Sequence, residues 1–439
     1  MDADALPTTE GARGDGGIAA TPLLSQRQRW AYLCCNFAMG TFAAFNNFTL
    51  TLWLSGFTSS YLIIGLMGNS RSLEGAVVSP IMGAWSDRVW LGWLGRRRPF
   101  VLIGGLLSAA TLALTPTIGR ISLPGWMGWL GPGVLQLGPP IFAIFLFTMA
   151  FHVMDDVHKA LLADITSPDE RNGLSALSVT VEMASQVLIL LLGFLLWNDR
   201  VTDLAFIVAG AVMSLALLGT VLGVREPAPA DWSMRRRMES ASDGVAISAR
   251  SLLRQYRGAT ALCLAAFCYW AGVMATMPLI SIYTRDILGA DVGEAQLLPG
   301  LMLLTTTLLA IPMGWLGDVI GKRPVMVLGY VLMIVTAIAA MIVSTIPEGV
   351  GLFLFAGVGN SAVMVMTLPL LADLVPRDRI GAAAGLLAAA GSIAAPFSSL
   401  VAGALSDVYG PRAIFVVMAV MVAAALVFIR GAQNNDGGG

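Results

Sequence analysis

The chain has 439 residues, of which 56% are hydrophobic and only 12% are charged, and its formal net charge is −1. Soluble globular proteins carry about 25% charged residues, so this composition indicates an integral membrane protein. The near-zero net charge argues against a nucleic-acid-binding role. Residues 1–28 are polar and show no cleavable signal pattern. We expect them to form a disordered cytosolic tail.

Apolar windows long enough to cross about 30 Å of hydrocarbon as a helix recur along the chain. They predict an all-α membrane protein with twelve transmembrane helices in two pseudo-symmetric six-helix halves. The halves are expected at 29–224 and 258–430, joined by a central cytoplasmic loop at 225–257 and followed by a disordered tail at 431–439. The predicted spans are 31–54, 58–82, 99–119, 140–164, 174–197, 203–224, 260–284, 295–317, 324–345, 350–374, 381–404 and 411–430.

The distribution of basic residues predicts the orientation, because loops rich in Lys and Arg stay in the cytoplasm. With both termini cytoplasmic, twenty Lys and Arg lie in cytoplasmic segments and four lie on the opposite side. We therefore expect a protein of the bacterial inner (plasma) membrane with both ends inside. All four cysteines fall within predicted spans, where packing is a more natural role than a disulfide.

A short turn recurs at the ends of several spans. It reads GAWSDRVWLGWLGRRRPF at 83–100, GWLGDVIGKRPV at 314–325 and GALSDVYGPR at 403–412. The glycine allows two helix backbones to approach closely, and the aspartate can cap a neighbouring helix or hold the arginines that follow. A single copy could be an ordinary polar loop, but three copies at matching helix ends make that interpretation less natural. The first two copies, with their basic partners, predict a gate at the cytoplasmic face. The candidate gate residues are Gly83, Asp87, Arg88, Arg96, Arg97, Arg98, Asp164, Arg171, Gly314, Asp318, Lys322, Arg323, Asp373 and Arg379.

The repeated turns and the two-half layout resemble the major facilitator superfamily. Within it, VVSPIMGAWSDR, LGRRRPF and KALLADI resemble the sucrose/proton symporters of the glycoside-pentoside-hexuronide branch. A second resemblance, at LGWLGRRRPF, LLADITSPDER and VREP, is to light-harvesting assembly proteins of photosynthetic bacteria. The first resemblance implies a sugar carrier, and the second implies an assembly factor that transports nothing.

The stretch FHVMDDVHKALLAD (151–164) places charges within a predicted span. At about 100° per residue, His152, Asp155, Asp156 and Lys159 share one helix face. Lys159 lies four residues after Asp155 and three after Asp156, the spacings at which helical side chains meet. Two carboxylates around one ammonium group favour keeping one proton on the pair. We therefore predict a proton-coupling set of Asp155, Asp156, Lys159 and Glu182.

Two other interpretations of this stretch remain open. The Asp155–Lys159 pair could simply lock the helix to a neighbour. A metal site formed by His152, Asp155, Asp156 and His158 is disfavoured, because the charge of Lys159 on the same face would repel a divalent cation. By its position before ALLAD, Lys159 corresponds to an arginine that the sucrose symporters use in coupling and substrate recognition, as the resemblance implies.

Other polar residues within the spans predict a lined cavity for a solute. The candidate substrate-binding residues are Asn46, Asn47, Arg71, Glu74 and Gln186 in the first half and Tyr269, Trp270 and Asn360 in the second. Arg71 and Glu74 are three residues apart and can pair. Each of these residues alone could equally serve packing.

The chain lacks the phosphate-binding loop of ATP-driven pumps, since GDVIGKRP has the wrong spacing. We predict no enzyme activity, cofactor or metal. The sequence thus predicts a monomeric secondary transporter in the lipid bilayer, with proton-linked symport of a small polar solute such as a sugar. An exporter of amphipathic compounds and a non-transporting assembly factor are the alternatives.

Overall fold

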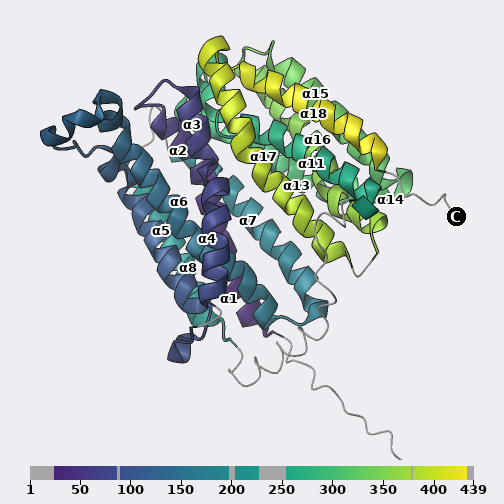
Figure 1. Cartoon of the computed structure of the whole chain (residues 1–439), viewed down its shortest axis with the longest axis horizontal. Coiled ribbons are helices and arrows are strands. Elements are labelled where there is room, and N and C mark those ends of the chain that lie inside the picture. The colour runs from purple at the N-terminus through teal and green to yellow at the C-terminus, as the bar shows by residue number, and fades with distance from the viewer. Residues whose placement is uncertain (1–23, 87–88, 197–202, 227–253, 377–378, 433–439) are drawn as a thin grey trace, which may run out of the picture.

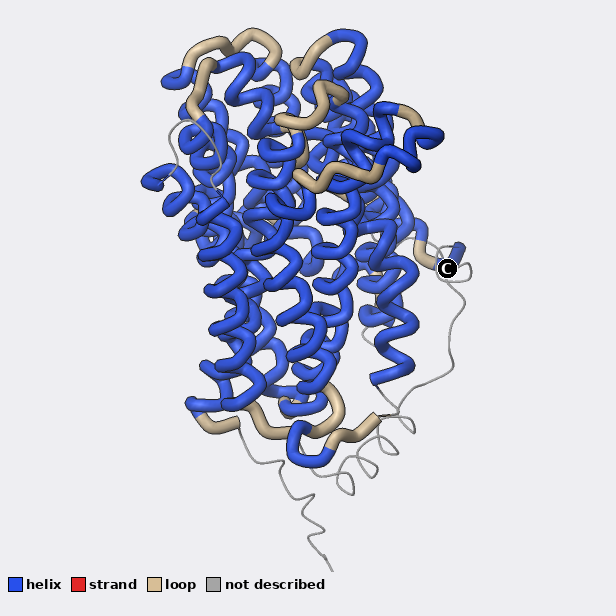
Figure 2. Tube along the Cα trace, turned by 90° about the vertical axis from the view of Figure 1, so that its left-hand side faces the viewer, coloured by secondary structure: helices blue, strands red, loops and turns tan. Residues whose placement is uncertain are grey.

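The computed structural model describes residues 24–86, 89–196, 203–226, 254–376 and 379–432. Every regular element among these residues is a helix (Figure 2). The predicted central loop and both predicted tails lie largely outside the described residues. The first helix begins at Gln26, within the predicted tail, because Ser25 and Gln28 form a capping box there.

The helices form two bundles that lie side by side (Figure 1). The N-terminal half comprises α1 (Gln26–Ala44), α2 (Leu50–Leu54), α3 (Tyr61–Gly68), α4 (Ser70–Ser86), α5 (Arg98–Gly119), α6 (Pro132–Ile165), α7 (Pro168–Leu196) and α8 (Asp203–Gly223). The C-terminal half comprises α11 (Arg257–Thr276), α12 (Ile280–Leu288), α13 (Val292–Leu308), α14 (Ala310–Ile320), α15 (Lys322–Ala340), α16 (Ile346–Leu374), α17 (Ile380–Tyr409) and α18 (Ala413–Phe428). Short 3₁₀ turns lie at Gly92–Leu94, Gly125–Leu130 and Ile429–Gly431.

Each predicted span has a helical counterpart. Among the described residues, nine helices are long and apolar enough to cross a membrane, and the bent pair α13 and α14 makes a tenth. The two remaining predicted spans are helical but interrupted: α1 continues through a π-helical segment, Phe45–Thr49, into α2, and α3 is separated from α4 at Asn69. The predicted all-α fold is confirmed, and among the described residues ten of the twelve predicted spans are long and apolar enough to cross a membrane when the bent pair is counted as one.

The interruptions fall at polar residues and prolines. The π-helical segment contains Asn46, whose side chain donates a hydrogen bond to the carbonyl oxygen of Gly68 at 3.1 Å. Pro278 lies between α11 and α12, and α13 meets α14 at an angle of 48°. Pro and π-bulges are the usual causes of sharp helix kinks. At two of the breaks, Asn46 and Asn69 donate hydrogen bonds to backbone carbonyl groups of other segments, Gly68 and Met274.

The halves are joined at the end of the molecule that the predicted orientation places outside, which we call the outer end. Thr49 donates to Gln296 at 2.8 Å, and Arg285 donates to Ser55 at 2.8 Å. The packing of α17 differs along its length: a Cβ atom on Gly403 would lie 2.5 Å from the Cα of Leu62, whereas one on Gly381 or Gly385 would meet nothing within 4 Å. The helix is therefore tightly packed at the outer end and has open space at the cytoplasmic end.

Candidate functional site

The charged stretch lies on α6, which packs against α4 and α5 in the N-terminal half. Asp155 is buried, with 6% of its surface exposed, about ten residues before the end of α6. The ammonium group of Lys159 donates to its Oδ2 at 2.8 Å. The other oxygen, Oδ1, is buried and has no hydrogen-bond partner among the described residues. The spacing of four residues thus produces the contact that the sequence predicts.

Asp156 turns toward His152 on the same helix. Its Oδ2 lies 4.0 Å from Nδ1 of His152, and the other ring nitrogen lies 2.8 Å from the carbonyl oxygen of Arg71. One ligand atom from each of His152, Asp155 and Asp156 lies within 4.8 Å of the others, a spacing that a metal ion could use. The ammonium group on Asp155 opposes a divalent cation there, so we retain the interpretation as a proton site.

Glu182 comes to this cluster from α7. Its carboxylate is near enough to Asp155, Lys159 and Arg71 to interact electrostatically with all three. Gln186 lies one turn further along α7 and is buried beside Met183, its amide nitrogen 3.8 Å from the sulfur. Residues from α4, α6 and α7 therefore meet around Asp155.

His158 has a different environment from His152. Its ring is fully buried, stacks on Tyr32 at 4.3 Å between centroids, and places Nε2 3.2 Å from Oδ1 of Asn36. It therefore packs α6 against α1 and lies away from the shared face. Tyr32 and Asn36 are partners that the sequence analysis did not identify. The only signal for Asn36 was an amide within an apolar span.

The predicted pairing of Arg71 with Glu74 is wrong. The guanidinium of Arg71 lies over the rings of Phe42 and Phe151, 5.9 and 6.0 Å from their centroids. Cation–π contact with two aromatic faces favours this position. Glu74 is buried, and its Oε2 has no hydrogen-bond partner among the described residues.

The two asparagines of the π-helical segment contact each other. Asn46 donates to Oδ1 of Asn47 at 3.1 Å. Oδ1 of Asn46 is buried without a described partner. The N-terminal half therefore has two buried acceptor atoms without a described partner, Oδ1 of Asn46 and Oε2 of Glu74.

In the C-terminal half, the predicted substrate residues bond to one another. The hydroxyl of Tyr269 donates to Oδ1 of Asn360, and the amide of Asn360 donates to Thr306 at 3.0 Å. Trp270 is half-buried and meets the Tyr269 ring edge-on at 5.9 Å. Thr306 is a further partner that the sequence analysis did not single out. These polar groups tie α11, α13 and α16 together.

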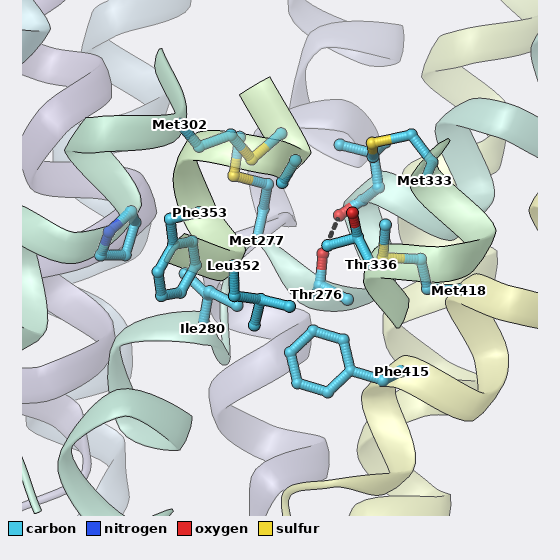
Figure 3. A pocket seen from close by; sticks show the side chains of 13 residues that line it. Thr276, Met277, Ile280, Met302, Met333, Thr336, Leu352, Phe353, Phe415 and Met418 are labelled. Atoms are coloured by element: carbon cyan, nitrogen blue, oxygen red, sulfur yellow. Dashed lines mark hydrogen bonds between the residues drawn. The ribbon is translucent and has the colours of Figure 1, made fainter. Parts of the chain in front are cut away.

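A cavity of about 30 Å³ also lies inside the C-terminal half (Figure 3). None of the predicted site residues lines it. Among its lining residues, only Thr276 and Thr336 have side-chain oxygens. The hydroxyl of Thr276 donates to the carbonyl oxygen of Val273 at 2.8 Å. The wall is otherwise apolar: Val273, Met277, Ile280, Pro299, Met302, Met333, Leu352, Phe353, Ala356, Phe415 and Met418.

The basic turn of the N-terminal half is held by two carboxylates. Asp164 pairs with Arg96 and, at 3.0 Å, with Arg97, which also contacts Ser86. Glu226 is buried and accepts the backbone N–H groups of Arg96, Arg97 and Arg98 at 2.8 to 3.0 Å. The sequence analysis did not assign a role to Glu226.

The remaining gate candidates of this half are Arg171, Gly83, Asp87 and Arg88. Arg171 donates to the carbonyl of Ala163 at 3.1 Å, which fixes the turn after α6. Gly83 lies near the end of α4. Asp87 and Arg88 lie outside the described residues.

The corresponding turn of the C-terminal half is more open. Lys322 pairs with Asp373 at 2.6 Å, and Arg323 donates to the carbonyls of Ile429 and Arg430. Asp318 is exposed, and Arg379 stands at the start of α17. Gly314 has only Val365 near its Cβ position, at 3.9 Å, so the close approach predicted for it is absent. Gly317 instead lies against the thioether end of the Met366 side chain. These contacts lie within each half.

Comparison with known proteins places this architecture. Residues 262–435 match the model of the Major Facilitator Superfamily. A bacterial homologue of the iron transporter ferroportin, solved in an inward-facing state, superposes with a TM-score of 0.68, at 16% identity, over 94% of this chain and 100% of that chain. A D-xylose-proton symporter superposes with a TM-score of 0.66, at 14% identity, over 93% and 97%. The chain has the major facilitator fold.

Among curated sequences, the sucrose transport protein SUC3 of Arabidopsis thaliana is 29% identical over 111 residues, which is 24% of this chain and 18% of the relative. Across the first curated relatives, the matched part is 18% to 39% of the relative's length. These matches support a major facilitator transporter and give weak support to the sucrose-like branch. None of them supports the resemblance to light-harvesting assembly proteins.

Proposed function

We propose that the chain is a secondary active transporter that couples the movement of a small polar solute, a sugar or glycoside, to a flow of protons. The buried carboxylate of Asp155 and its ammonium partner Lys159 carry this proposal. A charge at the bilayer centre costs at least about 3 kcal/mol even on the mildest scales, so such groups persist where they serve a path or a pairing.

The geometry around Asp155 suits a proton carrier. One of its oxygens binds Lys159, while the other is buried without a described partner and can accept a proton with no hydrogen bond broken. Protonation removes the charge that Lys159 neutralises, so the ion pair weakens as the proton arrives. Glu182, within electrostatic reach, offers a second carboxylate that senses the same change. Loading and release of the proton thereby alter the contacts between α6 and α7.

The solute class is supported by buried polar atoms of the N-terminal half and by the relatives. Buried acceptors on Asn46 and Glu74 could bind solute hydroxyls, and filling an unmade hydrogen bond in a buried site is favourable. The sucrose transport protein and the D-xylose-proton symporter are sugar carriers by name. The ferroportin homologue is named for iron, so the solute needs a direct test.

The decisive experiment is solute uptake into proteoliposomes under an imposed pH gradient, screened over sugars, glycosides, nucleosides and divalent metals. For the accepted solute, Asp155→Asn should lower the initial rate of uphill uptake by about 100-fold, since Asn cannot carry a proton. Exchange of solute without a gradient should persist in part.

Asp286→Asn is the matched control, because Asp286 pairs with the adjacent Arg285 at the outer end, away from α6. It should retain uphill uptake. Normal uphill uptake by Asp155→Asn would remove that residue from the coupling role and with it this mechanism.

A second candidate is an exporter of amphipathic compounds, which would bind in an expanded form of the apolar cavity in the C-terminal half, since its volume of about 30 Å³ admits only about one water molecule. Four methionines and two phenylalanines line it, and methionine-rich walls adapt to varied apolar shapes. Competition by chemically unrelated amphipathic compounds, with no competition by sugars, would support this candidate over the sugar symporter.

A further inference from the structure

We infer that Asp407 and Gly403 of α17 form the latch of the outer gate by closing on the start of α3. The inference rests on the alternating-access function proposed above and names the residues that hold one of its states. α3 belongs to the N-terminal half and α17 to the C-terminal half, and the two helices lie side by side (Figure 1).

The carboxylate of Asp407 caps α3 from the other half. Its Oδ1 accepts the backbone N–H of Tyr61 at 2.5 Å, and its Oδ2 accepts the hydroxyl of Ser60 at 2.9 Å and lies 3.4 Å from the N–H of Leu62. The first N–H groups of a helix have no partner within the helix, and a negative charge there is favoured by the helix dipole. One side chain thus satisfies the start of a helix 346 residues away in the sequence.

Gly403, one turn before Asp407, lets the two backbones come together. A Cβ atom at this position would lie 2.5 Å from the Cα of Leu62 and 3.0 Å from the carbonyl oxygen of Tyr61. Both obstacles are backbone atoms, so no side-chain rotation would relieve the clash. Any larger residue would push α17 away from α3.

Ser399 extends the same stripe of α17 by one more turn. Its hydroxyl contacts the amide of Asn69, which also donates to the carbonyl of Met274 at 2.9 Å. Ser399, Gly403 and Asp407 are spaced by four residues and therefore share one helix face. The C-terminal half therefore contacts both the start of α3, at Tyr61, and the residue that follows its end, Asn69.

This contact is where the third copy of the repeated turn, GALSDVYGPR, acts. Its glycine makes the close approach and its aspartate makes the cap that the sequence suggested for the other copies. Asp318 in the second copy is exposed and makes no hydrogen bond or ion pair with another described residue. Of the two copies whose aspartate the structure describes, the one at the outer end therefore forms the latch.

Opening the outer end requires α17 to leave α3, so the cap from Asp407 exists only while that end is closed. An interaction present in one state and absent in the other shifts the balance between them. Asp291 provides the contrast: it caps α13, within its own half, by accepting the N–H of Glu294 at 2.7 Å. That cap is retained in both states and shifts nothing.

The test is a distance measurement between spin labels on cysteines introduced at Val134 and Ser344, which are exposed at the outer ends of the two halves. The four native cysteines are replaced by alanine, and the protein is in lipid without solute or pH gradient. Asp407→Ala should raise the ratio of outer-open to outer-closed protein about fivefold, equivalent to ~1 kcal/mol. Asp407→Asn should give a smaller rise, since its one oxygen can still accept.

Gly403→Val should shift the ratio at least as far as Asp407→Ala. Asp291→Ala and Gly351→Val are the controls; a Cβ on Gly351 meets nothing within 4 Å. An unchanged distance distribution in both Asp407→Ala and Gly403→Val would overturn the latch, as would an equal shift in the controls. Because the measurement needs no transport, failure of proton coupling at Asp155 would leave its result intact.

Discussion

The N-terminal half buries carboxylate, imidazole and guanidinium groups, whereas no Asp, Glu, His, Lys or Arg is buried among the described residues of the C-terminal half. Asp155, His152 and Glu74 are all buried in the first half. In the second half, the buried polar groups Tyr269 and Asn360 bond to each other, and the cavity is apolar. Two halves of one architecture therefore have different chemistry. A half that holds ionisable groups can respond to a proton, while a half that holds neutral groups supplies shape.

The cytoplasmic turns show the same contrast in energetic terms. In the N-terminal half, Glu226 is buried and receives three backbone N–H groups beside Arg98. In the C-terminal half, the Lys322–Asp373 pair is largely open to solvent. Breaking a buried, hydrogen-bonded charge leaves its partners unsatisfied, whereas an exposed pair contributes little. Similar sequences thus produce one turn with a buried carboxylate and one with a solvent-exposed ion pair.

The largest effect on stability is expected from Glu226→Ala. It removes the acceptor for three backbone N–H groups and the carboxylate 3.6 Å from Nε of Arg98. We expect a loss of ~3 kcal/mol in the stability of the N-terminal half. It should appear as a lower midpoint of thermal unfolding in detergent.

Glu348→Ala is an exposed comparison at the outer end of the other half. Glu348 also accepts two backbone N–H groups, from Ser344 and Thr345, but it is exposed. Its removal should lower the midpoint by less. Equal shifts for the two variants would show that burial does not set the contribution of such a cap.

An intermediate effect is expected from Tyr269→Phe. This change leaves Oδ1 of Asn360 without the hydroxyl that it accepts, at a cost of ~1 kcal/mol. If the network only ties helices together, the midpoint of unfolding falls while the KM for the solute stays unchanged. A raised KM with an unchanged midpoint would instead place Tyr269 in contact with the solute. Phe267→Leu, a half-buried neighbour that makes no such hydrogen bond, is the control.

The sequence predicted the parts of this protein that depend on local spacing. Hydropathy predicted the spans, and the interval of four residues predicted the contact between Asp155 and Lys159. Contacts between distant segments could not be predicted from local spacing. Asp407, for example, accepts the backbone N–H of Tyr61, which is 346 residues away in the sequence. The pairing of Arg71 with Glu74 failed because spacing permitted it but could not reveal the aromatic faces of Phe42 and Phe151 nearby.

Other features had no local signal at all. The cavity is formed where side chains from several helices of the C-terminal half meet, so no single segment encodes it (Figure 3). In the sequence, Glu226 is a single charge at the start of a polar loop. Its role as a cap depends on the backbone N–H groups of Arg96 to Arg98, which are distant in the sequence. A tightly packed glycine and a glycine in open space look alike in a sequence. The repeated turn therefore predicts a close approach at Gly314, whereas the structure packs Gly317 against the Met366 side chain.

The smallest effect is expected from Asp373→Asn, the exposed partner of Lys322. With 51% of the Asp373 side chain and 31% of the Lys322 side chain exposed, solvent screens the pair, and its loss should cost ~0.5 kcal/mol or less. Lys322 also keeps its hydrogen bond to the carbonyl of Pro369 at 3.2 Å, so the turn retains one anchor. Asp164→Asn, at the equivalent and more buried position of the first half, should lower the midpoint of unfolding several times further, because that carboxylate pairs with both Arg96 and Arg97. Matching shifts for the two aspartates would mean that the halves differ in their interior chemistry alone and not in how firmly their turns are held.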